Sequence, residues 1–210
     1  MNKLLPILTL PMALFCLAPA QAQSLENTIQ LPNGDVLSPV SILPNGDFSA
    51  GIEGWDAGGF VGARPDGKGQ WMNNYEIRRD KEATLIRITC LDPDGKDFAI
   101  FTLDDIPLPT DTKFRTLLLS YRYCIAQLKL GELNYNTLRF NLAWYDAGGK
   151  KIDNAIIEFR KNVPVWTDKE EILRVPRDAT FARFSIHFLG ANGIIDITNL
   201  KLQPISTRRK

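Results

Sequence analysis

The stretch Ala182-Arg183-Phe184-Ser185-Ile186-His187-Phe188 alternates apolar and polar side chains without interruption. Successive side chains of a strand point to opposite faces, so Arg183, Ser185 and His187 share one face and the apolar residues share the other. Residues 138–145 repeat this pattern. A period of two over this length is typical of antiparallel strands that are buried on one face. The expected core therefore includes Phe140, Leu142, Trp144, Phe184, Ile186 and Phe188.

The sequence from residue 41 onward is typical of an all-β domain, because short segments rich in strand-forming residues alternate with clusters of the turn residues Gly, Pro, Asn and Asp. Residues 162–171 include Pro164 and are expected to form a connection. About nine strands with almost no helix predict an antiparallel two-sheet sandwich of the jelly-roll kind. The predicted strands are residues 76–79, 84–91, 98–103, 116–126, 137–145, 155–159, 171–175, 181–189 and 194–202.

The first 22 residues have the composition of a secretory signal peptide. Lys3 supplies a positive charge, residues 4–17 are apolar, and Ala20-Gln21-Ala22 fits a cleavage site. The mature protein is therefore expected in the periplasm or outside the cell. No later apolar run approaches the length of a transmembrane helix, so no membrane span is expected.

The segment 23–40 is polar and irregular, and we expect either a linker or an added edge strand there. Its pentad Leu31-Pro32-Asn33-Gly34-Asp35 returns at Leu43-Pro44-Asn45-Gly46-Asp47, and each copy predicts a tight turn. We expect one domain at residues 41–204 and a short basic tail at 205–210.

The charges of the mature chain are balanced. Without Lys3, 24 of the 25 Lys and Arg residues remain, against 24 Asp and Glu. Proteins that bind nucleic acid or anionic membranes carry a basic excess, so this balance argues against both partners. It fits an uncharged ligand, or none.

Two cysteines of the mature chain, Cys90 and Cys124, lie in predicted strands. In an exported protein such a pair can be oxidised to a disulfide, whereas separate free cysteines usually behave as small buried hydrophobic residues. Strand parity argues against pairing, because Cys90 shares a face with Ile86 and Ile88, and Cys124 shares one with Ser120 and Arg122.

Signatures of catalysis are absent from the sequence, and we expect a non-enzymatic protein. There is no His-Glu-x-x-His or Gly-x-Ser-x-Gly motif, and His187 is the only histidine. The doublets Asp104-Asp105 and Glu170-Glu171 are adjacent residues of strand-like segments. Their side chains would point to opposite faces, so they are predicted to be turn and edge charges.

The order of several short motifs resembles that of CenC-type carbohydrate-binding modules, a group of galactose-binding-like jelly rolls. The resemblance covers about residues 41–204 and implies that the segments 45–48 and 194–202 are neighbours. It also assigns Trp55 and Trp166 to packing, as strand parity does for Trp144. The motifs that carry it are Asn45-Gly46-Asp47-Phe48, Gly54-Trp55, Asp105-Ile106-Pro107-Leu108-Pro109, Ser120-Tyr121-Arg122-Tyr123, Val175-Pro176, Ile186-His187-Phe188 and Ile195-Asp196-Ile197-Thr198-Asn199-Leu200.

The same resemblance raises the question of a structural calcium ion. Family members carry acidic residues at the positions of Ser49 and Thr198, which are not acidic here. Asp47 and Asp196 lie close by in the sequence and would substitute, together with backbone carbonyls. The alternative is that Asp47 is a turn residue and Asp196 a solvated strand residue. No cofactor is otherwise required.

A sugar site needs flat apolar surfaces and a few polar groups. By the resemblance, the strand that carries His187 lines a sugar-binding cleft, and we expect His187 to share that surface with Trp71, Phe98 or Tyr145. For each candidate the alternative is an ordinary surface or packing role. The complete set of candidate ligand-binding residues is Trp71, Tyr75, Phe98, Arg122, Asn141, Tyr145, Arg183 and His187.

Two functions stay open from the sequence. The first is an exported, non-catalytic module that binds a polysaccharide or glycan. The second is a structural or protein-interaction jelly roll that binds no sugar, because one fold hosts many functions. Convergence of Trp71, Tyr145 and His187 would favour sugar, and a flat or charged sheet face would favour a protein partner.

Overall fold

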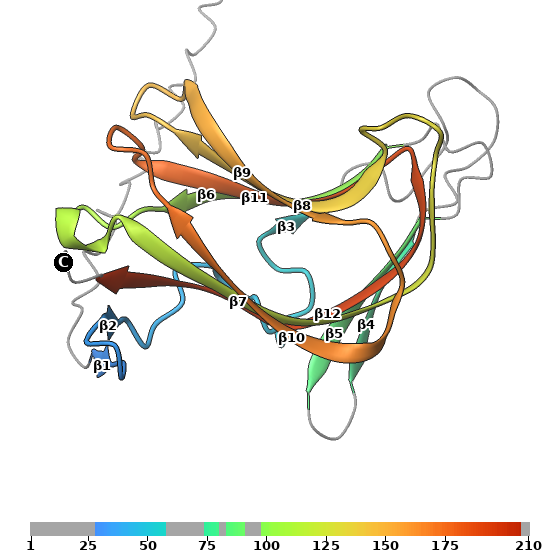
Figure 1. Ribbon diagram of the computed structural model, residues 1–210, viewed down its shortest axis with the longest axis horizontal. Coiled ribbons are helices and arrows are strands. Elements are labelled where there is room, and N and C mark those ends of the chain that lie inside the picture. The colour runs from blue at the N-terminus through green and yellow to red at the C-terminus, as the bar shows by residue number, and fades with distance from the viewer. Residues whose placement is uncertain (1–27, 58–73, 80–82, 91–97, 207–210) are drawn as a thin grey trace, which may run out of the picture.

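The computed structural model describes residues 28–57, 74–79, 83–90 and 98–206. Residues 1–22, where the signal peptide is expected, and Trp71 lie outside these ranges. Within them the chain forms two antiparallel sheets that face each other in a jelly-roll sandwich, as predicted (Figure 1). In these ranges the only helical element is the 3-10 turn η1 (Thr112–Phe114), and no helix is long and apolar enough to cross a membrane.

The seven-stranded sheet is built around the last strand of the chain. Strand β12 pairs with β7 along one side, and with β5 and then β2 along the other. Within the described residues, β10 pairs only with β7 and β4 only with β5, so both lie at edges. The strands are β1 (Ile29–Gln30), β2 (Val36–Leu37), β4 (Asn74–Arg79), β5 (Thr84–Cys90), β7 (Thr116–Leu130), β10 (Val163–Arg174) and β12 (Ala191–Ser206).

The five-stranded sheet has the order β3-β6-β11-β8-β9. From β5 onward, every connection except that between β8 and β9 crosses from one sheet to the other, which is the jelly-roll path. Strands β8 and β11 have the bounds expected from their alternating sequences. The strands are β3 (Trp55–Asp56), β6 (Phe98–Pro107), β8 (Thr137–Tyr145), β9 (Lys151–Phe159) and β11 (Phe181–Leu189).

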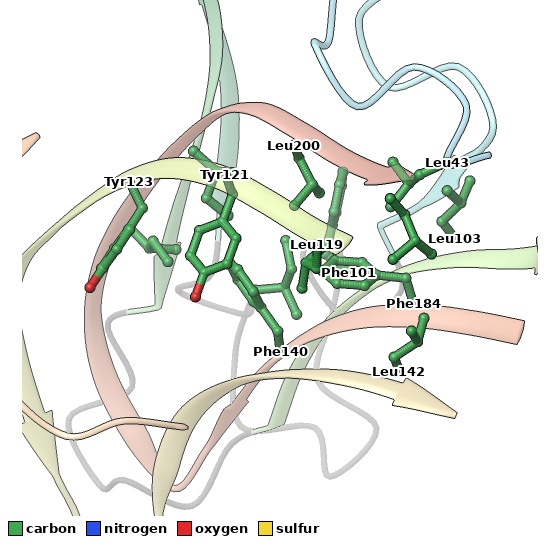
Figure 2. Packing of buried hydrophobic residues seen from close by; sticks show 14 of the residues in the cluster. Leu43, Phe101, Leu103, Leu119, Tyr121, Tyr123, Phe140, Leu142, Phe184 and Leu200 are labelled. Atoms are coloured by element: carbon green, nitrogen blue, oxygen red, sulfur yellow. The ribbon is translucent and has the colours of Figure 1, made fainter. Parts of the chain in front are cut away.

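The hydrophobic core lies between the two sheets, and all six predicted core residues belong to it, with exposed fractions of 0–2%. Aromatic rings provide much of the contact. The ring of Phe140 meets Tyr121 edge-on at 5.0 Å between centroids and approaches Phe184 at 5.4 Å (Figure 2). Tilted and edge-on arrangements of this kind are favoured by the quadrupoles of the rings.

Strand β10 corrects the expectation that residues 162–171 form a connection. The strand runs from Val163 to Arg174 and therefore contains Pro164. Proline cannot donate a ladder hydrogen bond, but it is tolerated on an edge strand or beside an irregularity. Both conditions hold, since β10 is an edge strand and its register with β7 shifts between Val163 and Thr167.

The expectation that Trp166 packs in the core is wrong. It lies on β10 with 39% of its surface exposed, and the guanidinium carbon of Arg122 lies 5.8 Å from the centroid of its ring. Trp166 lies on the outward face of the seven-stranded sheet, beside the exposed side chains of Arg122 and Asp168, so the core does not cover it. Trp55 and Trp144 are buried, as expected.

Three strands contain bulges, and β6 and β7 continue through theirs beyond their predicted ends. Asp105 in β6, Gln127 in β7 and Asn199 in β12 have φ values of 53°, 56° and 53°. The pairings of these strands shift register beside those residues. A residue at positive φ locally reorients the chain, so the strand resumes pairing afterwards instead of ending.

The two ends of the domain lie side by side, as the resemblance implied. The backbone of Gly46 accepts a hydrogen bond from the Leu200 amide at 3.0 Å, and Ile42 donates to Leu202 at 2.8 Å. Before them, the first proline pentad forms the turn of the β1–β2 hairpin. Strand β2 pairs with the end of β12, so this hairpin extends the seven-stranded sheet.

The two cysteines are free thiols on opposite faces of the seven-stranded sheet, in agreement with their strand parity. Cys90 is fully buried in the core. Cys124 faces outward, and its sulfur lies 3.9 Å from a carboxylate oxygen of Asp196. Burial and this carboxylate raise the pKa of the Cys124 thiol, so it stays protonated and weakly reactive.

Candidate functional site

The outer face of the five-stranded sheet carries the polar side of strand β11. Figure 1 shows this sheet bending, with its outer face on the inside of the bend. Ser185 lies in register between Thr102 of β6 and Asn141 of β8, and His187 is directly opposite Arg139 of β8. We call this surface, formed by the outward side chains of β6, β11, β8 and β9, the outer face.

A chain of polar side chains crosses the middle of the outer face. The Asn154 amide nitrogen donates to the Asn141 side-chain oxygen at 3.1 Å, and the Asn141 amide nitrogen donates to the Ser185 hydroxyl at 3.4 Å. The same hydroxyl lies 2.6 Å from Nε2 of His187. The chain thus joins β9, β8 and β11 and fixes the orientation of three side chains.

Aromatic rings lie at one end of this face. Tyr145 and Phe181 stack with their centroids 5.1 Å apart and their planes 6° from parallel. The guanidinium carbon of Arg183 lies 5.5 Å from the Tyr145 centroid, and Arg183 also pairs with Asp104 at 2.5 Å. Both rings are half-buried, so the stack is rigid and still offers apolar surface.

His187 lies toward the other end and is uncharged at neutral pH. Burial, together with the positive charges of Arg139 and Lys151, lowers the pKa of His187 to about 4. Its Nδ1 atom is shielded from solvent and has no hydrogen-bond partner in the described part of the chain. The Nε atom of Arg139 is likewise shielded from solvent and has no hydrogen-bond partner among the described residues.

The structure brings four of the eight predicted ligand-binding residues to the outer face: Asn141, Tyr145, Arg183 and His187. His187 and Tyr145 share this face but do not touch. Tyr145 is opposite Phe181, six residues before His187 on β11, which corresponds to roughly 20 Å at the rise of a strand.

Two predicted residues do not join this group. Tyr75 packs against the core, with its ring 5.9 Å from Phe101, because the inner face of β4 lies over the end of the sandwich. Arg122 is on the opposite sheet, beside Asp168 and Trp166. Phe98 pairs with Leu189 through its backbone, but its side chain, like all of Trp71, lies outside the described part.

The two carboxylates considered for calcium have other partners. Both oxygens of Asp196 accept hydrogen bonds from Arg87, at 2.7 Å each. Asp47 accepts from the amide and hydroxyl of Ser49 and so stabilises its own turn. No group of three or more potential His, Cys, Asp or Glu metal ligands exists among the residues that the structure describes.

Sequence reasoning missed several residues of the outer face. Asn154 was overlooked because the strand was predicted to begin at residue 155, whereas β9 begins at Lys151. Phe181 was not selected because an apolar residue at a strand end suggests the core. The alternating sequence already placed Arg139 on the polar face of its strand, but only the strand register shows that it lies directly opposite His187.

Neither a protein-family profile nor a curated protein sequence matches this chain. Similar solved structures include the enzymatically active domain of tailspike protein 4 from bacteriophage CBA120, with TM-score 0.55 and 16% identity over 78% of this chain. The match covers only 21% of that tailspike chain, so this protein spans about a fifth of its length.

An apo cyclase from Fischerella sp. has TM-score 0.52 and 12% identity, over 84% of this chain and 98% of the cyclase. A family 16 carbohydrate-binding module also matches, with TM-score 0.48 and 18% identity over 77% of this chain and 98% of the module. At these identities the tailspike and cyclase similarities establish the shared β-sandwich fold alone.

Proposed function

We propose that this protein is an exported, non-catalytic module that binds carbohydrate on the outer face of its five-stranded sheet. The observation that carries the proposal is that one surface presents both a row of hydrogen-bonded polar side chains and a stack of two aromatic rings. Asn141 and Asn154 bring amide groups that donate and accept, and Tyr145 with Phe181 brings flat apolar area. A sugar ring presents the complementary features, namely hydroxyl groups at its rim and C–H groups on its faces.

The dimensions of the outer face suit a chain of sugars better than a single ring. The aromatic stack and His187 are six residues apart along β11, or roughly 20 Å. We therefore expect affinity to increase with oligosaccharide length. The affinity of each contact should be modest, because every sugar hydroxyl must be desolvated before it binds.

A protein-interaction function is the second candidate, and a specific observation favours it. Ile156 on the outer face is 45% exposed, and Val165 and Ile172 on the edge strand β10 are 69% and 64% exposed. Exposed aliphatic side chains are typical of contacts with proteins. In that case binding would depend on β10 or on Ile156, and no sugar would compete for the site.

Two arginines provide a matched test. Arg183 and Arg122 both have side chains that are 45% exposed, and each lies beside one aspartate and one aromatic ring. Arg183 is on the outer face, whereas Arg122 is on the opposite sheet. After a glycan array identifies a ligand of the mature protein, Arg183→Ala should weaken its binding by about 1–2 kcal/mol, and Arg122→Ala should leave it unchanged.

The result that would contradict the proposal is a folded protein that binds no glycan on the array. An equal loss in both arginine variants would place the sugar elsewhere on the molecule. Export is tested separately, by expressing the full-length chain and sequencing the N-terminus of the mature product. A mature N-terminus at residue 23 is expected.

A further inference from the structure

Arg139 has no hydrogen-bond acceptor or ion-pair partner among the residues that the structure describes. It lies on the outer face of β8, directly opposite Glu158 of β9, but both side-chain contacts of that glutamate go to Arg160, at 2.9 Å. The Nε atom of Arg139 is shielded from solvent and has no partner in the described part. A half-buried cation in this position is destabilising, because water no longer solvates it fully and no anion replaces the water.

A second unpartnered nitrogen lies beside it. His187 is the direct cross-strand neighbour of Arg139, and its Nδ1 atom is likewise shielded and unpaired. Cross-strand neighbours on one face have their Cβ atoms about 5 Å apart, so the two side chains flank a common point.

The charges around this point are positive. Arg139 and Lys151 both act on His187, and neither has a carboxylate partner within the described residues. The acidic side chain opposite Arg139, that of Glu158, is engaged with Arg160. On β6, the residue opposite His187 is Ile100, which carries no charge. This end of the outer face therefore attracts an anion.

We propose that the carbohydrate bound on the outer face carries an anionic substituent, held by the guanidinium of Arg139 next to His187. The proposal rests on the proposed function and specifies its ligand class, an acidic sugar chain. A planar guanidinium binds a carboxylate with two parallel hydrogen bonds, and it also binds sulfate. The near-zero net charge of the whole chain is compatible with anion binding, because only the positive charges close to His187 act on the bound anion.

The test uses the mature protein and titration calorimetry with two pairs of probes and one further neutral sugar. Oligogalacturonide and its methyl ester have the same sugar backbone, with and without carboxylates. Dextran sulfate and dextran make the same comparison for sulfate, and neutral galactan reports on uncharged sugars. We expect the anionic member of one pair to bind about tenfold more tightly than its neutral counterpart, the effect of one charge-assisted contact.

Arg139→Gln should abolish this preference, and Arg122→Gln, on the opposite sheet, should retain it. If Arg139→Gln fails to fold, Lys151→Gln removes a neighbouring exposed charge and should reduce the preference in part. At a pH near 5, binding should also take up protons, because an anion beside His187 raises the pKa of the imidazole from about 4 toward that pH. Calorimetry in two buffers of different ionisation enthalpy measures that uptake.

The possible outcomes separate this inference from the proposed function. Equal binding of acidic and neutral sugars would overturn the inference and leave a neutral-sugar module. Equal anion binding by the Arg139→Gln and Arg122→Gln variants would also overturn it, since the attraction would then be nonspecific. Binding of neither acidic nor neutral sugars would refute the proposed function itself. A preference confined to the galacturonide pair or to the dextran pair would support the inference and identify the anion as carboxylate or sulfate.

Discussion

Ser185 is nearly fully buried although it lies on the outer face of a sheet. Its hydroxyl lies within hydrogen-bonding distance of the Asn141 carbonyl, the Asn141 side chain and His187. A buried hydroxyl needs such partners, because an unpaired one is destabilising by about 1–3 kcal/mol. Ser185 therefore acts as the junction that sets the positions of two predicted sugar-binding side chains.

The histidine at this junction leads to a pH-dependent prediction. The pKa of His187 is about 4 in the folded protein and has its ordinary value of 6.5 in the unfolded chain. The unfolded chain therefore binds the proton first as the pH falls. Stability should be complete above about pH 6.5 and should decline by up to about 3 kcal/mol as the pH falls to about 4. This is an upper bound, because the ring is partly exposed.

Nuclear magnetic resonance of the imidazole should give a titration midpoint near pH 4, and urea unfolding from pH 7 to pH 4 should give the loss of stability. His187→Asn is the control, since it keeps a hydrogen-bonding group but cannot titrate in this range. Its stability should depend less on pH. A midpoint near 6.5 in the wild-type protein would contradict the prediction, because it would show that water solvates the ring and that burial does not lower its pKa.

At the scale of elements, the face of the strand on which a tryptophan lies decides what it contributes. Trp144 lies on the inward face of β8 and is 2% exposed. Trp166 lies on the outward face of β10, beside Arg122, and is 39% exposed. The same residue type therefore fills the core in one strand and remains on the surface in the other.

This contrast predicts a pair of unfolding measurements. Trp144→Ala should destabilise the protein by about 3–5 kcal/mol, through lost burial and a cavity that the surroundings cannot fill. Trp166→Ala should change stability by less than about 1 kcal/mol, because it removes only one exposed contact with a cation. Chemical denaturation of both variants measures the difference. Similar losses would mean that Trp166 is covered in solution by a part of the chain outside the described residues.

At the scale of the whole molecule, the sandwich is closed by contact between its first loop and its last strand. Gly46 is buried against β12, where a Cβ atom would lie 2.0 Å from the backbone oxygen of Leu200. No such approach is possible, so one of the two segments must move. The side chain of Asn45 holds the same loop in shape, through hydrogen bonds with Ala50, Gly51 and Glu53.

Gly46→Ala should therefore destabilise the protein by about 3 kcal/mol or more, since rigid backbone cannot yield. Gly51→Ala in the same loop is the matched control. Its φ of 69° is unfavourable for alanine, but no atom lies within 4 Å of the added Cβ. The control should lose only about 1 kcal/mol. Thermal unfolding of both variants would contradict this account if the two losses were equal.

The sequence by itself determined which face of a strand each residue occupies. The bounds of β8 and β11, the six core residues and the opposite orientation of Cys90 and Cys124 all follow from a period of two. That period is a local property of the extended chain, so it is visible without knowledge of the fold. The motif order also placed the first loop next to the last strand.

Only the tertiary structure decided which strands are neighbours and in which register. Pro164 was misjudged because the sequence does not reveal that β10 is an edge strand, and Trp166 because the strand, and with it the outward face of Trp166, was not predicted. Asn154, Asn141, Ser185 and His187 form one polar chain only because β9, β8 and β11 pair at those residues. Likewise, Arg139, which has no partner among the described residues, lies opposite His187 only through long-range pairing. Register depends on bulges and cross-strand packing, which link residues far apart in the chain and leave no periodic trace in the sequence.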